Sequence, residues 1–74
     1  MTLSEGKIGH TYIVEEVQVA GNVTRRLEAL GVNEQTSIAV LNAKAKGPMI
    51  IKVRGTRLAL GRQITDQIQI REVE

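Results

Sequence analysis

Apolar side chains recur at every second position in four short runs of the chain, which is the spacing of half-buried β-strands. The runs are His10–Val19, Thr36–Leu41, Met49–Arg54 and Gln67–Arg71. Alternation is cleanest in the third run, where the inward face carries Met49, Ile51 and Val53 and the outward face carries Lys52 and Arg54. The pattern predicts a protein made mainly of strands.

The other runs alternate less regularly. Their inward positions are Tyr12, Val14, Val17 and Val19 in the first, Ile38 and Val40 in the second, and Ile68 and Ile70 in the last. The parity changes after Glu15-Glu16, which predicts a bulge of the kind that helps a sheet to curl. Leu41 is a further apolar candidate for the core, at the end of the second run.

One segment has helical spacing instead of alternation. Its apolar stripe consists of Val23, Leu27 and Leu30, which are four and three residues apart. Asn22 is a suitable N-cap, and Gly31 can adopt the left-handed conformation that ends a helix, so we expect a short helix over Asn22–Gly31. One more helical turn is expected at Arg62–Asp66, before the last strand.

A hairpin is expected where Gly55-Thr56 separates two alternating runs, because glycine suits the first position of a two-residue turn. The register that follows pairs Val53 with Leu58, Ile51 with Leu60, and Arg54 with Arg57. About five strands closed in this way, with the helix inserted after the first strand, give a small, mainly β barrel.

Length and composition limit what this barrel can be. A chain of 74 residues suits a single domain, residues 1–74, and it has no cysteine for a disulfide or a thiolate metal site. The segment Met1–His10 lacks the continuous apolar run of a signal peptide or membrane span, so we expect the protein in the cytoplasm.

The distribution of charge is more informative than its total. The net charge of +2 is too small to identify a partner. Between Glu34 and Asp66, however, the chain has no acidic residue. The basic residues within that interval are Lys44, Lys46, Lys52, Arg54, Arg57 and Arg62. Two of them lie in the long connection Lys44–Pro48, and most of the others lie on the expected hairpin.

Taken together, the succession of elements resembles the FeoA family, the small cytoplasmic companions of the bacterial ferrous iron permease FeoB. The matching features are Leu3 and Gly9, Arg25-Arg26-Leu27, Leu30-Gly31-Val32, Ile38-Ala39-Val40-Leu41, Gly47-Pro48, Val53-Arg54-Gly55, Leu58-Ala59-Leu60 and Ile68-Gln69-Ile70. The chain departs from the family pattern at Gly6, Glu34-Gln35 and Ile64-Thr65. The resemblance implies an SH3-like barrel and an accessory or regulatory role in ferrous iron uptake. It also implies contact with the cytoplasmic, GTPase-bearing part of FeoB, with the membrane reached only through that partner.

Groups able to carry out chemistry are sparse. His10 is the only histidine, and neighbouring Glu15 and Glu16 point to opposite faces of an extended chain, so we expect no metal site. Neither a nucleophile with a base partner nor a phosphate-binding loop is visible in the sequence, so we expect no enzymatic activity and no cofactor. Any metal-binding assignment would rest on resemblance to metal-dependent repressors that share the domain.

Two other functions stay open alternatives to accessory contact with a permease. Small basic barrels often bind nucleic acid, but those that grip single strands stack bases on aromatic rings. This chain has one tyrosine and neither phenylalanine nor tryptophan, so we expect no nucleic-acid partner. A structural subunit that self-associates is the other alternative, because so small a core often leaves apolar surface uncovered.

The candidate partner surface lies on the hairpin and the helix. Lys52, Arg54 and Arg57 share the outward face of the hairpin, and Arg25 and Arg26 are expected near the start of the helix, at the positive end of its dipole. An acidic partner would relieve the repulsion among these groups. The apolar opening of the barrel around Leu58 and Leu60 is the second candidate surface.

Overall fold

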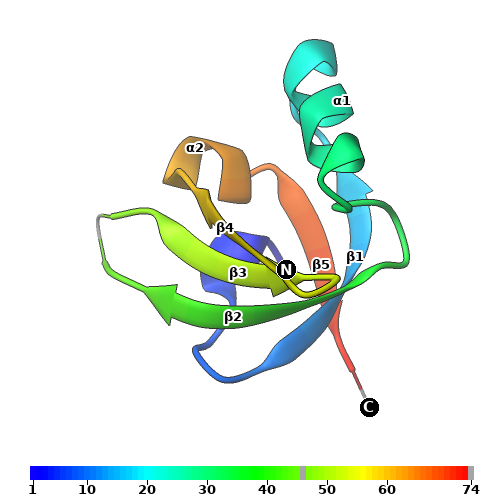
Figure 1. Cartoon of the computed structure of the whole chain (residues 1–74). Helices are drawn as coiled ribbons and strands as arrows, with labels where there is room; N and C mark the ends of the chain where they lie inside the picture. Colours follow the sequence, from blue (N-terminus) through cyan, green and yellow to red (C-terminus); the bar gives the residue numbers. More distant parts are fainter. Residues whose placement is uncertain (46, 74) are drawn as a thin grey trace.

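The computed structural model describes residues 1–45 and 47–73. Lys46, one of the basic residues expected in the connection Lys44–Pro48, lies outside the described residues. The elements of the structure are η1 (Leu3–Glu5), β1 (Thr11–Val17), α1 (Gly21–Ala29), β2 (Ser37–Ala43), β3 (Met49–Val53), β4 (Thr56–Leu60), α2 (Arg62–Thr65) and β5 (Ile68–Glu72). The strands form one antiparallel sheet in the order β4-β3-β2-β1-β5, which curls strongly, with α1 at one end (Figure 1). The predicted fold class is confirmed: a mainly β barrel with a helix inserted after the first strand.

The core consists of the inward positions that alternation predicts, together with contributions from less regular segments. Buried strand residues include Tyr12, Val14, Ile38, Val40, Met49, Ile51, Val53, Ile68 and Ile70. Leu3 from η1 and Val32 from the loop after α1 are also fully buried, although neither belongs to an alternating run. Leu3 and Val32 show how the connections between strands help to complete so small a core.

Two strand irregularities bend the sheet. The register between β1 and β5 shifts between Val14 and Glu16, which confirms the bulge predicted at Glu15-Glu16. A second shift, between Val40 and Asn42 of β2, leaves Leu41 without a partner on β3. Leu41 is therefore 37% exposed, and its expected place in the core is wrong because the bulge turns it outward.

Helix α1 begins one residue before the predicted N-cap. The backbone N–H groups of Val23 and Thr24 donate to the Ala20 carbonyl at 2.9 and 3.0 Å, so Ala20 is the N-cap and Asn22 lies inside the first turn. The Thr24 hydroxyl adds a hydrogen bond to the Val19 carbonyl (2.7 Å), which fixes the chain entering the helix. None of the helices in the described ranges combines the length and apolar character that crossing a membrane requires.

The end of α1 follows the sequence prediction. Gly31 has φ +100°, a left-handed conformation that glycine adopts readily. Its N–H donates to the Glu28 carbonyl at 3.0 Å, and the N–H of Val32 donates to the Leu27 carbonyl at 2.8 Å. These paired bonds turn the chain so that Val32 enters the core directly after the helix.

The β3–β4 hairpin forms, but its register differs from the prediction by two residues. The turn is Arg54-Gly55, with φ 51° and 81°, so both central residues are left-handed and the twist of the turn matches the strands. Val53 therefore pairs with Thr56 and Lys52 with Arg57, and the predicted Arg54–Arg57 pair is wrong. Because the shift is even, every side chain stays on its predicted face.

The predicted helical turn before the last strand is present as α2, and its first residue has a structural role. The guanidinium of Arg62 donates from Nε to the Gly47 carbonyl (3.0 Å), from Nη1 to the Ser4 carbonyl (3.2 Å), and from Nη2 to the Lys44 carbonyl. We call this group of contacts the Arg62 clamp. It joins η1, the β2–β3 connection and α2, which are far apart in the sequence.

Candidate functional site

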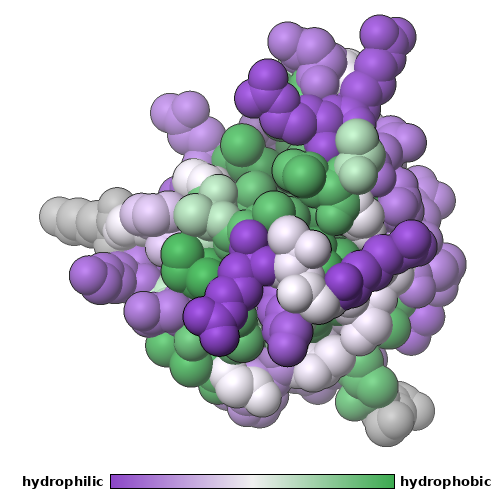
Figure 2. Space-filling view, viewed as in Figure 1, coloured by the Kyte–Doolittle hydropathy of each residue, from purple (hydrophilic) through white to green (hydrophobic). Residues whose placement is uncertain are grey.

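A groove lies between α1 and the edge of the sheet at β4. Its volume is about 350 Å³, and it is lined by Asn22, Val23, Arg26, Leu27 and Leu30 of the α1 region, Leu58, Ala59 and Leu60 of β4, and Ile64 of α2. We call it the α1–β4 groove. Figure 2 shows hydrophobic surface gathered beneath α1 and beside β4, with hydrophilic side chains around it.

The groove exists because α1 stands beside the sheet edge without covering it. Leu27 points into the core and is only 2% exposed, whereas Leu30 at the end of the same apolar stripe is 41% exposed. On β4, Leu60 is buried but Leu58 is only half-buried. Apolar surface next to the core is therefore exposed at this place, on Leu30 and Leu58.

Positive charge borders the groove. Arg26 is the one charged side chain among the described residues that line it. On the hairpin, Lys52 and Arg57 lie directly opposite each other in the register. Arg54 packs against the end of α1, since a Cβ on Gly31 would lie 3.2 Å from its Cδ. A cation beside the last turn of a helix is favourably placed in the field of the helix dipole.

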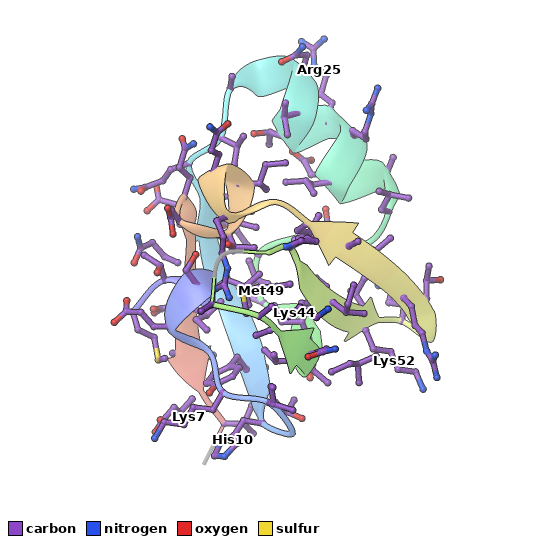
Figure 3. All side chains as sticks on the ribbon, turned by 90° about the vertical axis from the view of Figure 1, so that its left-hand side faces the viewer. Lys7, His10, Arg25, Lys44, Met49 and Lys52 are labelled. Atoms are coloured by element: carbon purple, nitrogen blue, oxygen red, sulfur yellow. The ribbon has the colours of Figure 1, made fainter. Side chains whose placement is uncertain are left out.

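The helix arginines are not where the sequence analysis placed them. Arg25 and Arg26 are the fifth and sixth residues of α1, and Arg26 belongs to its last turn, so the expected repulsion from the positive end of the helix dipole is wrong. The reason is that α1 starts at Gly21, before the predicted N-cap Asn22, so more of the helix precedes the two arginines. Figure 3 shows Arg25 at the outer end of α1, well separated from Lys52 on β3.

The structure thus divides the predicted partner residues into three places. Arg26, Leu58 and Leu60 line the α1–β4 groove. Lys52, Arg54 and Arg57 lie on the β3–β4 hairpin, whose strand β4 forms one side of the groove. Arg25 stands apart. Sequence reasoning placed Val23, Leu27 and Leu30 on one apolar stripe of the helix, but it did not indicate that Leu30 would be exposed. The lining residues that it missed are Asn22, Val23, Leu27, Leu30, Ala59 and Ile64.

The polar groups near His10 have structural roles. The rings of His10 and Tyr12 stack with centroids 6.3 Å apart, and the Tyr12 hydroxyl accepts a 2.8 Å hydrogen bond from the backbone N–H of Lys7. In η1, hydrogen bonds from the Thr2 backbone and hydroxyl lower the pKa of the Glu5 carboxyl. Within residues 1–45 and 47–73, no three His, Cys, Asp or Glu side chains gather as a metal site would need.

A curled sheet of five strands with a short inserted helix and an open apolar groove at its edge defines an SH3-like barrel, a class that a similar solved structure also represents. A family model described as the FeoA domain matches residues 1–72. The chain belongs to the FeoA domain family, as the resemblance in its sequence predicts.

Proteins similar to this chain are named for iron transport. One from Methanocaldococcus jannaschii, "Putative Fe(2+) transport protein A", is 28% identical over 72 residues, which are 97% of this chain and 87% of that protein. The crystal structure of an iron uptake regulatory protein (FeoA) matches with a TM-score of 0.90 at 30% identity, over 99% of this chain and 97% of the other. A FeoA protein from Chlorobium tepidum matches with a TM-score of 0.93 at 29% identity, over 100% of this chain and 71% of the other.

The same fold occurs in a different class of protein. A manganese-dependent transcriptional repressor matches with a TM-score of 0.87 at 17% identity, over 99% of this chain and 41% of the repressor. At this identity the likeness shows the fold alone.

Proposed function

We propose that this protein is a cytoplasmic accessory protein of ferrous iron uptake, acting through contact with the cytoplasmic, GTPase-bearing part of a FeoB-type permease. Membership of the FeoA domain family and the iron-transport names of similar proteins support the role in iron uptake. The observation that carries the mode of action is the α1–β4 groove, which exposes apolar side chains beside a cationic hairpin. Such a surface favours binding another protein over catalysing a reaction.

Binding to the permease tests this proposal directly. Full-length FeoB-type permease in lipid nanodiscs is immobilised, and association of the full chain is measured with and without a non-hydrolysable GTP analogue. We expect Leu30→Gln to weaken binding by about tenfold or more, because a polar side chain would enter the apolar groove and a loss of about 1.4 kcal/mol is a tenfold change. Leu30 is 41% exposed, so the fold should tolerate the change.

The matched control is Leu41→Gln. Leu41 is 37% exposed and lies on the β2 bulge, outside the groove, so its replacement should leave binding within about twofold of wild type. Equal loss in both variants would show that the groove is not the contact surface. Absence of binding by the unmodified chain, with either nucleotide state, would refute the proposed function.

The hairpin charges should govern the rate of association with the permease. In Arg54→Glu with Arg57→Glu, the carboxylate introduced at position 57 would face Lys52 across the hairpin, so the fold should be retained. We expect association to slow by about tenfold at low salt and its dependence on ionic strength to flatten, because long-range attraction to an acidic face would be lost. Stopped-flow or biosensor kinetics at several salt concentrations measure both effects.

A second charge-reversal variant tests whether the association rate depends on where the charges lie or only on the net charge. Lys7→Glu with Arg25→Glu changes the net charge by the same amount, but both residues lie away from the hairpin (Figure 3). This variant should retain most of the wild-type association rate and its dependence on salt. If the two double variants slow association equally, the hairpin has no special part in steering.

A further inference from the structure

The edge of β4 next to the groove has free backbone hydrogen-bonding groups. In the sheet order, β4 pairs with β3 on one side and has no strand on the other within the described residues. Val53 and Thr56 flank the two-residue turn, so they exchange both of their backbone hydrogen bonds, and paired positions then alternate along the hairpin. Arg57 and Ala59 therefore direct their N–H and C=O groups away from β3.

No other part of the described chain satisfies these groups. Neither Arg57 nor Ala59 takes part in any backbone hydrogen bond of a turn, loop or cap in residues 1–45 and 47–73. Both residues are exposed. A strand edge of this kind is a template for pairing with another extended chain.

We infer that an extended segment of the partner adds to β4 as a further strand, with its backbone paired to Arg57 and Ala59. This inference rests on the proposed function. An added strand would lie about 4.7–4.9 Å from β4, on the side where the α1–β4 groove opens. Its alternate side chains would then enter the groove against Val23 and Leu30. The groove volume of about 350 Å³ suits a few side chains of a strand and not a folded domain.

Charge decides what the outward side chains of this segment should be. Arg57 lies on the outer face of β4, opposite Lys52 of β3, and like charges at such a pair are unfavourable. An acidic residue on the added strand beside Arg57 would relieve this repulsion. The occupant is therefore a segment that alternates between apolar residues facing α1 and polar residues, acidic ones among them, facing outward.

The same charges argue against a second copy of this chain as the occupant. Two β4 edges paired with each other would bring Arg57 of one copy close to Arg57 of the other, with both Lys52 side chains nearby. Cationic residues on an edge strand are a recognised means of preventing such self-pairing. The β4 edge is thus protected against pairing with a second copy of this chain, whereas an acidic segment can still pair with it.

Ala59→Pro tests the backbone pairing without removing a side chain contact. Proline lacks the N–H that Ala59 directs outward, and it is tolerated on an edge strand where the N–H faces solvent. We expect Ala59→Pro to weaken binding to the permease in nanodiscs by about tenfold or more. The control is Leu41→Gln, on the β2 bulge and outside the α1–β4 groove, which should bind within about twofold of wild type. Equal binding by the two variants would overturn the inference.

Amide hydrogen exchange on the unmodified chain gives a second readout that needs no variant. In the complex with the permease, the amides of Arg57 and Ala59 should exchange at least about tenfold more slowly, while the Leu58 amide, already bonded to β3, should change little. If the permease binds and the Arg57 and Ala59 amides exchange as in the free protein, the inference is wrong and the proposed function stands.

A synthetic probe separates failure of the inference from failure of the proposed function. A capped nine-residue peptide of alternating valine and glutamate is titrated into the full chain, and exchange at Arg57 and Ala59 is followed. If the permease does not bind, protection by this peptide still supports the strand-addition site, and lack of protection overturns it. Protection that grows with protein concentration without any probe would identify a second copy as the occupant and also overturn the inference.

Discussion

Replacing Arg62 with alanine is expected to lower the free energy of unfolding by about 2–4 kcal/mol, since hydrogen bonds to a charged group contribute about 1.5–3 kcal/mol each and are not additive. The guanidinium of the Arg62 clamp bonds three carbonyls, those of Ser4, Lys44 and Gly47. Without it, η1 and the β2–β3 connection lose their shared attachment to α2. Denaturant unfolding followed by circular dichroism measures the change.

Two further variants test whether geometry or charge is responsible. Arg62→Lys retains the charge but not the planar arrangement of donors, so it should recover less than half of the lost stability. Gln63→Ala, at the exposed neighbouring position of α2, should remain within about 0.5 kcal/mol of wild type. A stability for Arg62→Ala close to that of Gln63→Ala would show that the clamp contributes little.

Leu27→Ala is expected to destabilise the protein by about 2–4 kcal/mol, because it leaves a cavity in the core where α1 packs on the sheet. Val53→Ala, at a fully buried position of β3, should have an effect of about 1–3 kcal/mol. The total stability expected for 74 residues is about 4–11 kcal/mol, so either change removes a large share of it.

Leu30→Ala is the internal control for Leu27→Ala. The two leucines belong to one helical stripe, but Leu30 is 41% exposed and Leu27 is 2% exposed. Thermal and denaturant melts should place Leu30→Ala within about 0.5–1 kcal/mol of wild type. Equal destabilisation by the two changes would mean that the burial assigned to the two ends of the stripe is incorrect.

The faces of the strands were predictable from sequence because a period of two leaves only two choices for each run. Met49, Ile51 and Val53 therefore lie in the core as expected. Register is harder, since the expected turn at Gly55-Thr56 and the observed turn at Arg54-Gly55 differ by a shift that preserves every face. The alternation of apolar and polar residues is the same for both turns, so it cannot distinguish them. Arg54, moreover, is not a residue type that suggests a φ above zero.

Features that depend on segments distant in sequence could not be predicted from local patterns. Arg62 looks like any solvated cation until the fold brings the Ser4 and Gly47 carbonyls to it. The α1–β4 groove likewise joins Leu30 to Leu58, and only the packing angle of α1 makes a groove between them. The resemblance to a family predicted the barrel, but not which of its surfaces lies open.

The pairing of β1 with both β2 and β5 also determines how the chain must fold. Tyr12 pairs with Glu72, so this ladder closes a loop of nearly the whole chain, and such non-local pairing slows folding to the millisecond-to-second range typical of SH3-like barrels. During synthesis at roughly 5–20 residues per second, several seconds pass between the emergence of β1 and that of β5. Throughout that interval the nascent β1 has an unpaired edge, which makes it the segment that a ribosome-associated chaperone would need to shield.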